Sequence, residues 1–260
     1  MFTSLSLPER FDVVSAASFR GFFESVRCSE IVVSLSREHF GRPRIHQRVA
    51  QAMAFYKDHI YPHVVNVLGD PKPFRKVREQ ILPVAEGKVL EVGVGAGPNL
   101  LLYDPARVSK IYALEPNPGM IRLAEEQRSR ASVEIEFIDL PGEHIPLADD
   151  AVDSVVSTFT LCTIPDVREA MRGMRRVLKP GGKFIFFEHG RAPDPQVREW
   201  QRRSEPITRF LLEGCTVTRD IPSLITGAGF EIQQISAAYL APFPKAWTYC
   251  FWGTAVRNSG

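Results

Sequence analysis

A glycine-rich loop behind an apolar run is the feature of this sequence best suited to chemistry. In VLEVGVGAGPNL, residues 89–100, an acid, Glu91, is followed by Gly93, Gly95 and Gly97 at every second position. Glycine permits tight turns and a close approach of the backbone to a ligand. Glu91 ends the apolar run, where its carboxylate could accept a hydrogen bond from an amino or cationic group of that ligand. The stretch therefore predicts a cofactor-binding loop.

The spacing of the glycines separates two kinds of cofactor. Dinucleotide-binding loops read G-x-G-x-x-G, with the last glycine beside the pyrophosphate, whereas here G-x-G-x-G is followed by Pro98 and Asn99. A second acid, Glu115, lies 18 residues beyond Gly97 (115 − 97), at the end of the next apolar segment, where a carboxylate can accept both ribose hydroxyls. This spacing favours a ribose-bearing cofactor other than NAD, and an NAD-dependent oxidoreductase is the alternative enzyme class.

The elements that must position these residues alternate between strand and helix. Apolar segments predict strands over residues 88–94, 110–116, 133–140, 151–161 and 183–189. Helical patterns fall over residues 74–85, 119–129, 166–179, 197–214 and 219–229. Two more strands, 230–240 and 247–257, close the chain with no helix between them. The pattern predicts a doubly wound, Rossmann-like α/β sheet of seven strands with an antiparallel C-terminal pair.

Composition excludes several other classes of protein. Lys+Arg 32 against Asp+Glu 30 gives a net charge of +2, which disfavours a dedicated nucleic-acid binder. The four cysteines are scattered without a CxxC pair, so neither a disulfide framework nor a metal site is expected. The N-terminus lacks a secretory signal and no apolar run reaches membrane-spanning length, which indicates a cytoplasmic protein.

Residues 1–52 differ from the rest because they show no alternation of strand and helix. Four apolar side chains in this segment share helical spacing: Phe19, Phe22, Phe23 and Val26. Three interpretations stay open: a helix packed on the main domain, a helix in peripheral contact with a membrane, or a dispensable extension. In the last case Met53 would be an alternative start, and residues 53–260 would form the functional domain.

The motifs together resemble those of class I S-adenosylmethionine-dependent methyltransferases. E-x-G-x-G-x-G is similar to motif I of that family, LEPNPGM to its second-strand acid, and RVLKPGGKFIFFEH to its fifth-strand signature. The resemblance extends from about Phe55 to the C-terminus. FTLCTIPD, FFEHG and EGCTVTRDIPSLITGAGF are similar to the alkyl-thiol and quinone-biosynthesis methyltransferases within it. The resemblance implies S-adenosylmethionine as cofactor and a helical insertion around residues 191–219 that caps the substrate.

The resemblance also implies a set of cofactor contacts. The methionine end of the cofactor is expected at Glu91, Gly93, Gly95, Gly97 and Asn99, and the ribose at Glu115, Pro116 and Asn117. The adenine is expected beside Gly142 and Glu143, and the transferring methyl group above Thr158, Phe159 and Leu161. Core packing is the alternative role for Phe159 and Leu161.

Methyl transfer from a sulfonium is an in-line displacement that depends mainly on positioning in a dry site. His189, after Glu188 at the end of the fifth strand, is the candidate general base or substrate orienter, because imidazole titrates near neutrality. A histidine held by a neighbouring backbone group is the alternative, and Glu188 could orient His189 or be structural. Expected acceptor contacts are Tyr56, His59, Trp200 and Arg219, with Tyr61 beside the cofactor. Cys162 and Cys215 are expected to be buried apolar groups rather than catalytic ones. Thiol, quinol or phenol, amine and lipid head group remain open as acceptors, as does a silent cofactor-binding module.

Overall fold

The structure is a computed structural model of the 260-residue chain, and it describes residues 51, 54–68, 70–240 and 244–258. The chain divides into two compact units, residues 1–50 and residues 51–260. The helix expected around Phe19 and its membrane contact lie outside the described residues. Among the residues described, no helix combines the length and the apolar character needed to span a bilayer.

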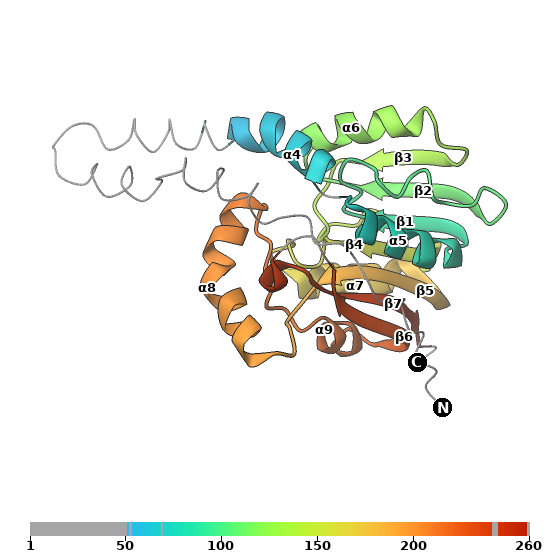
Figure 1. The fold of residues 1–260 in the computed structure, drawn as a ribbon. Coiled ribbons are helices and arrows are strands. Elements are labelled where there is room, and N and C mark those ends of the chain that lie inside the picture. The colour runs from blue at the N-terminus through green and yellow to red at the C-terminus, as the bar shows by residue number, and fades with distance from the viewer. Residues whose placement is uncertain (1–50, 52–53, 69, 241–243, 259–260) are drawn as a thin grey trace. The chain divides into compact units, whose positions relative to one another are not determined.

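The described part of the chain is built on a seven-stranded sheet with the order β3-β2-β1-β4-β5-β7-β6 (Figure 1). Its strands are β1 (Gly87–Val92), β2 (Val108–Leu114), β3 (Glu134–Ile138), β4 (Val152–Thr158), β5 (Leu178–His189), β6 (Phe230–Tyr239) and β7 (Tyr249–Arg257). The first five strands are parallel, and β7 runs antiparallel to both β5 and β6. The predicted fold and its antiparallel C-terminal pair are confirmed.

The helices follow the predicted order. They are α4 (Tyr61–Leu68) behind a π-helical turn η1 (Tyr56–Ile60), α5 (Lys72–Ile81), α6 (Pro118–Arg128), α7 (Val167–Val177), α8 (Pro195–Leu211) and α9 (Ile221–Gly227), with short 3₁₀ turns at Leu82–Val84 and Lys245–Trp247. The Asn117 side chain caps α6 by accepting from the Gly119 and Met120 amides, and Asp166 caps α7 by accepting from the Glu169 amide. Such caps satisfy amides that have no partner within the helix.

Alternating side chains of the buried strands form two cores, one on each face of the sheet. In β5, Ile185 and Phe187 pack into the core that α5 covers, and Phe184 and Phe186 pack into the core that α7 and α9 cover. All four are fully buried. This period of two is expected of a strand with both faces covered by helices.

One detail differs from the sequence-based expectation. The helix predicted over residues 166–179 ends at Val177, and β5 already begins at Leu178, with the Pro180–Gly182 turn as an irregularity in its pairing with β4. The connection from β1 to β2 contains turns but no helix. Gly93, Gly95 and Gly97 all have positive φ, and the loop they form brings the Asn99 side chain back to Glu91 instead of propagating a helix.

Candidate active site

Four parallel strands end at the same edge of the sheet, and their last residues outline the site. β1 and β4 are neighbours although β2 and β3 lie between them in the sequence, so the strand order reverses there. Open α/β sheets bind ligands at the carboxyl ends of strands flanking such a switch point. Glu91, Glu115, Thr158 and His189 all lie at these strand ends.

The three loop glycines have different surroundings. A Cβ on Gly93 would lie 2.2 Å from Oγ1 of Thr160, and one on Gly97 would lie 2.9 Å from Leu100 and 3.3 Å from the Ala124 backbone. These two glycines therefore permit close packing of the loop. A Cβ on Gly95 would meet nothing within 4 Å. Gly95 consequently borders open space at the end of β1, where a ligand could approach the backbone.

Glu91 is fully buried, and both its carboxylate oxygens are used within the protein. Oε1 accepts from Nδ2 of Asn99 at 2.8 Å, and Oε2 accepts from the Tyr103 hydroxyl at 2.7 Å. Nδ2 of Asn99 also donates to Oγ1 of Thr158 at 3.1 Å, which ties the loop to β4. Burial raises the pKa of Glu91 to about 7, against the effect of these donors and of Arg78. Glu91 thus holds the loop in shape from beneath.

Glu115 closes the loop from the side of β2. Its carboxylate accepts from the amides of Gly95 and Asn117, both at 3.0 Å, and its side chain is buried. Burial raises the pKa of Glu115 to about 7, and the charges of Glu213 and Asp139 act in the same direction. Three carboxylates around one loop favour a positively charged ligand.

The segment that precedes the sheet covers this loop. Tyr61 of α4 is buried against Ala96 of the loop and Met120 of α6. Nδ2 of Asn117 donates to the backbone oxygen of Lys57 at 3.0 Å, which ties the same segment to the start of α6. Burial and the charge of Glu213 raise the pKa of Tyr56, which is half-buried at this place. Tyr56 and Tyr61 therefore lie beside the glycine loop, and their contacts with the cofactor or acceptor stay predictions.

Glu188 holds the loop after β4. Its Oε1 accepts three hydrogen bonds: from the Ser157 hydroxyl at 2.7 Å and from the amides of Thr160 and Leu161 at 3.1 Å. Its Oε2 is buried without a hydrogen-bond partner. These contacts give Glu188 a part in shaping the loop beneath the expected methyl position, rather than in orienting His189.

An aromatic wall stands beside this loop, formed by Phe159, Phe74, Phe187 and His189. The Phe159 ring lies 4.3 Å from the rings of both Phe187 and His189, and 4.9 Å from that of Phe74. Phe159 has a φ of 56°, which is uncommon for a bulky residue. Such backbone strain is found chiefly at functional sites.

Two cysteines meet His189 at the end of this wall. The Sγ atoms of Cys162 and Cys215 are 3.5 Å apart, and Nδ1 of His189 is 4.0 Å from Sγ of Cys215. The pKa of the Cys215 thiol is lowered, mainly by its hydrogen bond with Cys162 and further by His189 and Arg219. Arg219 donates to the backbone oxygens of Leu161 and Ile164, and so ties the α8–α9 connection to the loop after β4.

The other predicted site residues divide between buried and exposed positions. Gly142 is buried, and a Cβ there would lie 2.7 Å from Ile164, while Glu143 accepts from the Asp166 amide at 3.2 Å. Leu161 is fully buried in the core on the α7 side, as its alternative role anticipated. Three predicted contacts are exposed: Pro116, His59 and Trp200, the last at 63%.

Sequence reasoning missed several residues of this site. Several residues contact the site or place a charge near it, yet no motif marks them: Tyr103, Arg78, Thr160, Ser157 and Glu213. Tyr103 carries the clearest available signal, because a buried acid such as Glu91 requires a donor.

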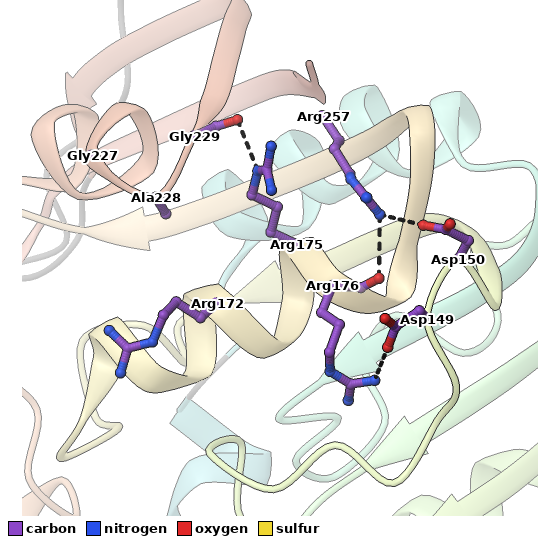
Figure 2. Close-up of a pocket in the computed structure, with 9 residues that line it drawn as sticks. All are labelled: Asp149, Asp150, Arg172, Arg175, Arg176, Gly227, Ala228, Gly229 and Arg257. Carbon is purple, nitrogen blue, oxygen red and sulfur yellow. Dashed lines mark hydrogen bonds and ion pairs between the residues drawn. The ribbon is translucent and has the colours of Figure 1, made fainter. Parts of the chain in front are cut away.

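A separate pocket of about 600 Å³ (Figure 2) lies at the opposite ends of the strands, where β4 and β6 begin and β7 ends. Four arginines line it, Arg172, Arg175, Arg176 and Arg257, together with Asp149, Asp150 and residues 227–229. All four arginines already have partners, and that of Arg172 is Glu169 within α7. Arg176 bonds Asp149 at 2.8 Å, Arg175 bonds the Gly229 oxygen at 3.3 Å, and Arg257 bonds Asp150. They tie α7 to the ends of neighbouring strands, away from the cofactor loop.

Comparison with known proteins decides the family. Residues 90–186 match the methyltransferase domain family. The chain is 35% identical over 190 residues to human thiol S-methyltransferase TMT1B, covering 67% of this chain and 77% of that protein. The chain belongs to the class I S-adenosylmethionine-dependent methyltransferases. Its glycine loop, Glu115 and the reversed strand order between β1 and β4 are the corresponding structural features.

More distant relatives agree with this assignment. Demethylmenaquinone methyltransferase of Paenarthrobacter aurescens is 26% identical over 181 residues, covering 69% of this chain and 64% of that protein. The crystal structure of a putative methyltransferase from Bacillus halodurans matches with a TM-score of 0.58 at 12% identity, covering 71% of this chain and 98% of the other. The structural match shows the fold alone.

The residues at the cofactor loop of this methyltransferase fit S-adenosylmethionine. This cofactor carries a sulfonium and an ammonium group, and Glu115, Glu213 and Asp139 supply negative charge around the loop. Gly95 borders open space. Asn99 also keeps a buried Oδ1 without a partner, an acceptor free for a ligand donor.

Proposed function

We propose that this methyltransferase transfers the methyl group of S-adenosylmethionine to the sulfur of a small, apolar thiol. The proposal is supported by the similarity to human thiol S-methyltransferase TMT1B, at 35% identity over 67% of this chain. It is also supported by the side chains at the ends of β4 and β5. There the aromatic wall includes the half-buried His189, whose ring lies 4.3 Å from that of Phe159.

The aromatic wall has two partly exposed rings, those of Phe159 and His189, which lie 4.3 Å apart. Phe74 and Phe187 pack against Phe159 and are themselves buried in the core. Apolar surface of an acceptor that is buried against the two exposed rings contributes roughly 25 cal/mol per Å². An acceptor with an alkyl or aromatic body is therefore favoured over a fully polar one. His189 orients the reacting end of the acceptor.

The available acid–base groups favour a thiol over an alcohol. Bound S-adenosylmethionine supplies a methyl group on a positively charged sulfur, which is already activated for displacement. A thiol, with a pKa of about 8.5, needs little help to lose its proton. An alcohol needs a strong base, but Glu91 and Glu188, the carboxylates next to the wall, are fully buried and hold loops by hydrogen bonds.

Acceptors that share one carbon skeleton and differ in the reacting atom test this proposal. Purified protein is supplied with S-adenosylmethionine and an alkyl thiol, the matching alcohol, the matching amine or a hydroquinone, and formation of the methylated product is followed by mass spectrometry. We expect kcat/KM for the thiol to exceed that for each other acceptor by at least about 100-fold. Glu115→Ala, which loses the predicted ribose acid, is the inactive control. Preferential methylation of the hydroquinone or amine would refute the thiol assignment.

A further inference from the structure

Three potential metal ligands converge from distant parts of the sequence at the end of the aromatic wall. Cys162 lies in the loop after β4, His189 ends β5, and Cys215 lies in the connection between α8 and α9. One ligand atom from each falls within 4.8 Å of the other two. A backbone hydrogen bond from the amide of Thr216 to the oxygen of Cys162, at 2.8 Å, holds the two cysteine segments together.

The distances suit a tetrahedral ion. Zinc binds thiolate sulfur at about 2.3 Å and imidazole nitrogen at about 2.0–2.1 Å, so ligand atoms on one ion lie about 3.5–3.8 Å apart. The measured separations are 3.5 Å between the sulfurs and 4.0 Å between Sγ of Cys215 and Nδ1 of His189. All three ligand atoms lie within 4.8 Å of one another, so side-chain movements of up to about 1 Å bring them to the separations of a tetrahedral zinc site.

We propose that Cys162, Cys215 and His189 bind one zinc ion, whose fourth ligand is the sulfur of the acceptor thiol. Two thiolates and an imidazole are a donor set that selects zinc among the common divalent ions. Three protein ligands with one open position are the arrangement of catalytic zinc sites, whereas structural sites use four. The spacing of the cysteines in the sequence did not predict this site. Cys215 is 26 residues from His189 and 53 residues from Cys162 along the chain, and only the fold brings the three together.

The surroundings place this cluster beside the cofactor loop. The Tyr61 phenol is close enough to Cys162, Cys215 and Glu115 for their charges to raise its pKa, after the larger effect of burial. Leu212 packs both against Cys162 and Cys215 and against the group of Tyr61, Ala96 and Met120, and so joins the cysteines to the covering of the cofactor loop. His189 packs on Phe159, the residue that follows β4. The ion would thus lie at the junction of the acceptor wall and the cofactor pocket.

The role of the fourth ligand rests on the proposed thiol methyl transfer. The acceptor thiol binds zinc as a thiolate and releases its proton to solvent. Its sulfur then forms a bond to the methyl carbon while the bond from that carbon to the sulfonium sulfur breaks. A neutral thioether and S-adenosylhomocysteine result, and the thioether, a weaker ligand than a thiolate, leaves the ion.

Metal binding is tested without reference to activity. Reduced, metal-free protein is titrated with Zn²⁺ against a chromophoric chelator, and with Co²⁺ to observe thiolate-to-cobalt charge-transfer absorption. We expect one equivalent bound with that absorption. Cys162→Ser, Cys215→Ser and His189→Ala should each weaken binding by more than about tenfold. Cys250→Ser is the matched control, since Cys250 is a buried cysteine outside the three-residue group, and should leave binding unchanged.

Three results would overturn the site. They are failure to bind either ion, equal binding by Cys162→Ser and the parent protein, and a Cys162–Cys215 disulfide in non-reducing peptide maps of protein that cannot be loaded with metal. The role of the fourth ligand is tested separately on cobalt-loaded protein. Addition of the alkyl thiol should shift the charge-transfer bands, while the matching alcohol should not. Unshifted bands would refute ligation of the acceptor but not the metal site itself. Cobalt spectra that shift as expected, without any methylation of the thiol, would refute the proposed function alone.

Discussion

Glu115 joins two elements of the fold at the place where the ribose of the cofactor is predicted to bind. It lies at the end of β2, and its carboxylate accepts from the Gly95 and Asn117 amides. Its predicted role with ribose hydroxyls requires the ionised form, which accepts hydrogen bonds. Burial, with the nearby charges of Glu213 and Asp139, raises its pKa to about 7. The carboxyl group therefore changes between its protonated and ionised forms in the physiological pH range.

Cofactor affinity should therefore depend on pH through Glu115. Because the folded pKa lies above the ordinary 4.5, the free protein takes up a proton as pH falls through about 7, and affinity should then decrease roughly tenfold per pH unit. Glu115→Gln should bind more weakly and without this dependence. Calorimetric titration of S-adenosylmethionine between pH 5.5 and 8.5 measures both, and a flat profile for the parent protein would contradict the assigned role. Since its folded pKa is raised, Glu115 should also stabilise the fold below about pH 4.5 and lose this contribution as pH rises through about 7.

Glu188 offers a second test, of structure against catalysis. Its Oε1 accepts from Ser157, Thr160 and Leu161. In Glu188→Gln the amide oxygen can accept all three, whereas Glu188→Ala leaves three buried donors unpaired and should cost about 3 kcal/mol or more. Urea denaturation at neutral pH should show Gln near the parent protein and Ala well below it. Equal stability of the two variants would mean that Glu188 does not hold this loop.

Individual residues were predictable where a motif marks them and unpredictable where only tertiary contact does. Glu115 was recognisable from its distance to the glycine loop and its strand end. The contact between Cys162 and Cys215 was not recognisable, because it forms only when the connection after α8 crosses the strand ends. A structural role for Glu188 was one of two predicted roles, but its partners were not predictable, since they include backbone amides of the loop after β4.

At the scale of elements, the loop after β1 depends on positive φ at its glycines. Gly95 has a φ of 56° with open space beside its Cα, and Gly181, in the turn within β5, has a φ of 74° with equally open space. An alanine at either position would therefore carry similar backbone strain. Only Gly95 lies at the expected cofactor site.

Gly95→Ala and Gly181→Ala form a matched pair. Each places a side chain in the left-handed region and should lower the free energy of unfolding by about 1–2 kcal/mol. Gly95→Ala should in addition weaken S-adenosylmethionine binding by more than about tenfold, because its methyl group occupies the space beside the loop. Calorimetric titration with parallel urea denaturation measures both effects. Equal cofactor affinity in the two variants would show that the ligand does not lie beside Gly95.

The order of elements could be predicted because each carries its own period. The apolar run of β4 and the helical spacing of α7 are local signals, as is the closing pair β6 and β7 without a helix between them. The ends were harder, because Pro180 and the following glycines suggested a helix stop, while β5 already begins at Leu178. The pairing of Leu178 with Val152 of β4 extends the strand backward through that irregular stretch.

At the scale of the whole molecule, the sheet and its covering segment are expected to form the functional unit. Residues 54–68 contact the cofactor side through Tyr61 and the Lys57 oxygen, and the chain divides into its two compact units after residue 50. A chain that begins at Met53 should fold and bind S-adenosylmethionine with the affinity of the full chain. Circular dichroism and calorimetric titration of both chains check this. Loss of folding or binding would show that residues 1–52 are required.

One measurement tests the central claim of thiol methylation most directly. The substrate is mercaptoethyl phenol, which offers a thiol and a phenol on one molecule, and the donor is S-adenosylmethionine with a deuterated methyl group. Mass spectrometric fragmentation locates the label in the product, with the Glu115→Ala protein as the background reaction. The account predicts enzyme-dependent labelling of sulfur alone. Labelling of the phenol oxygen or ring, or no labelling above background while the cofactor is bound, would contradict it.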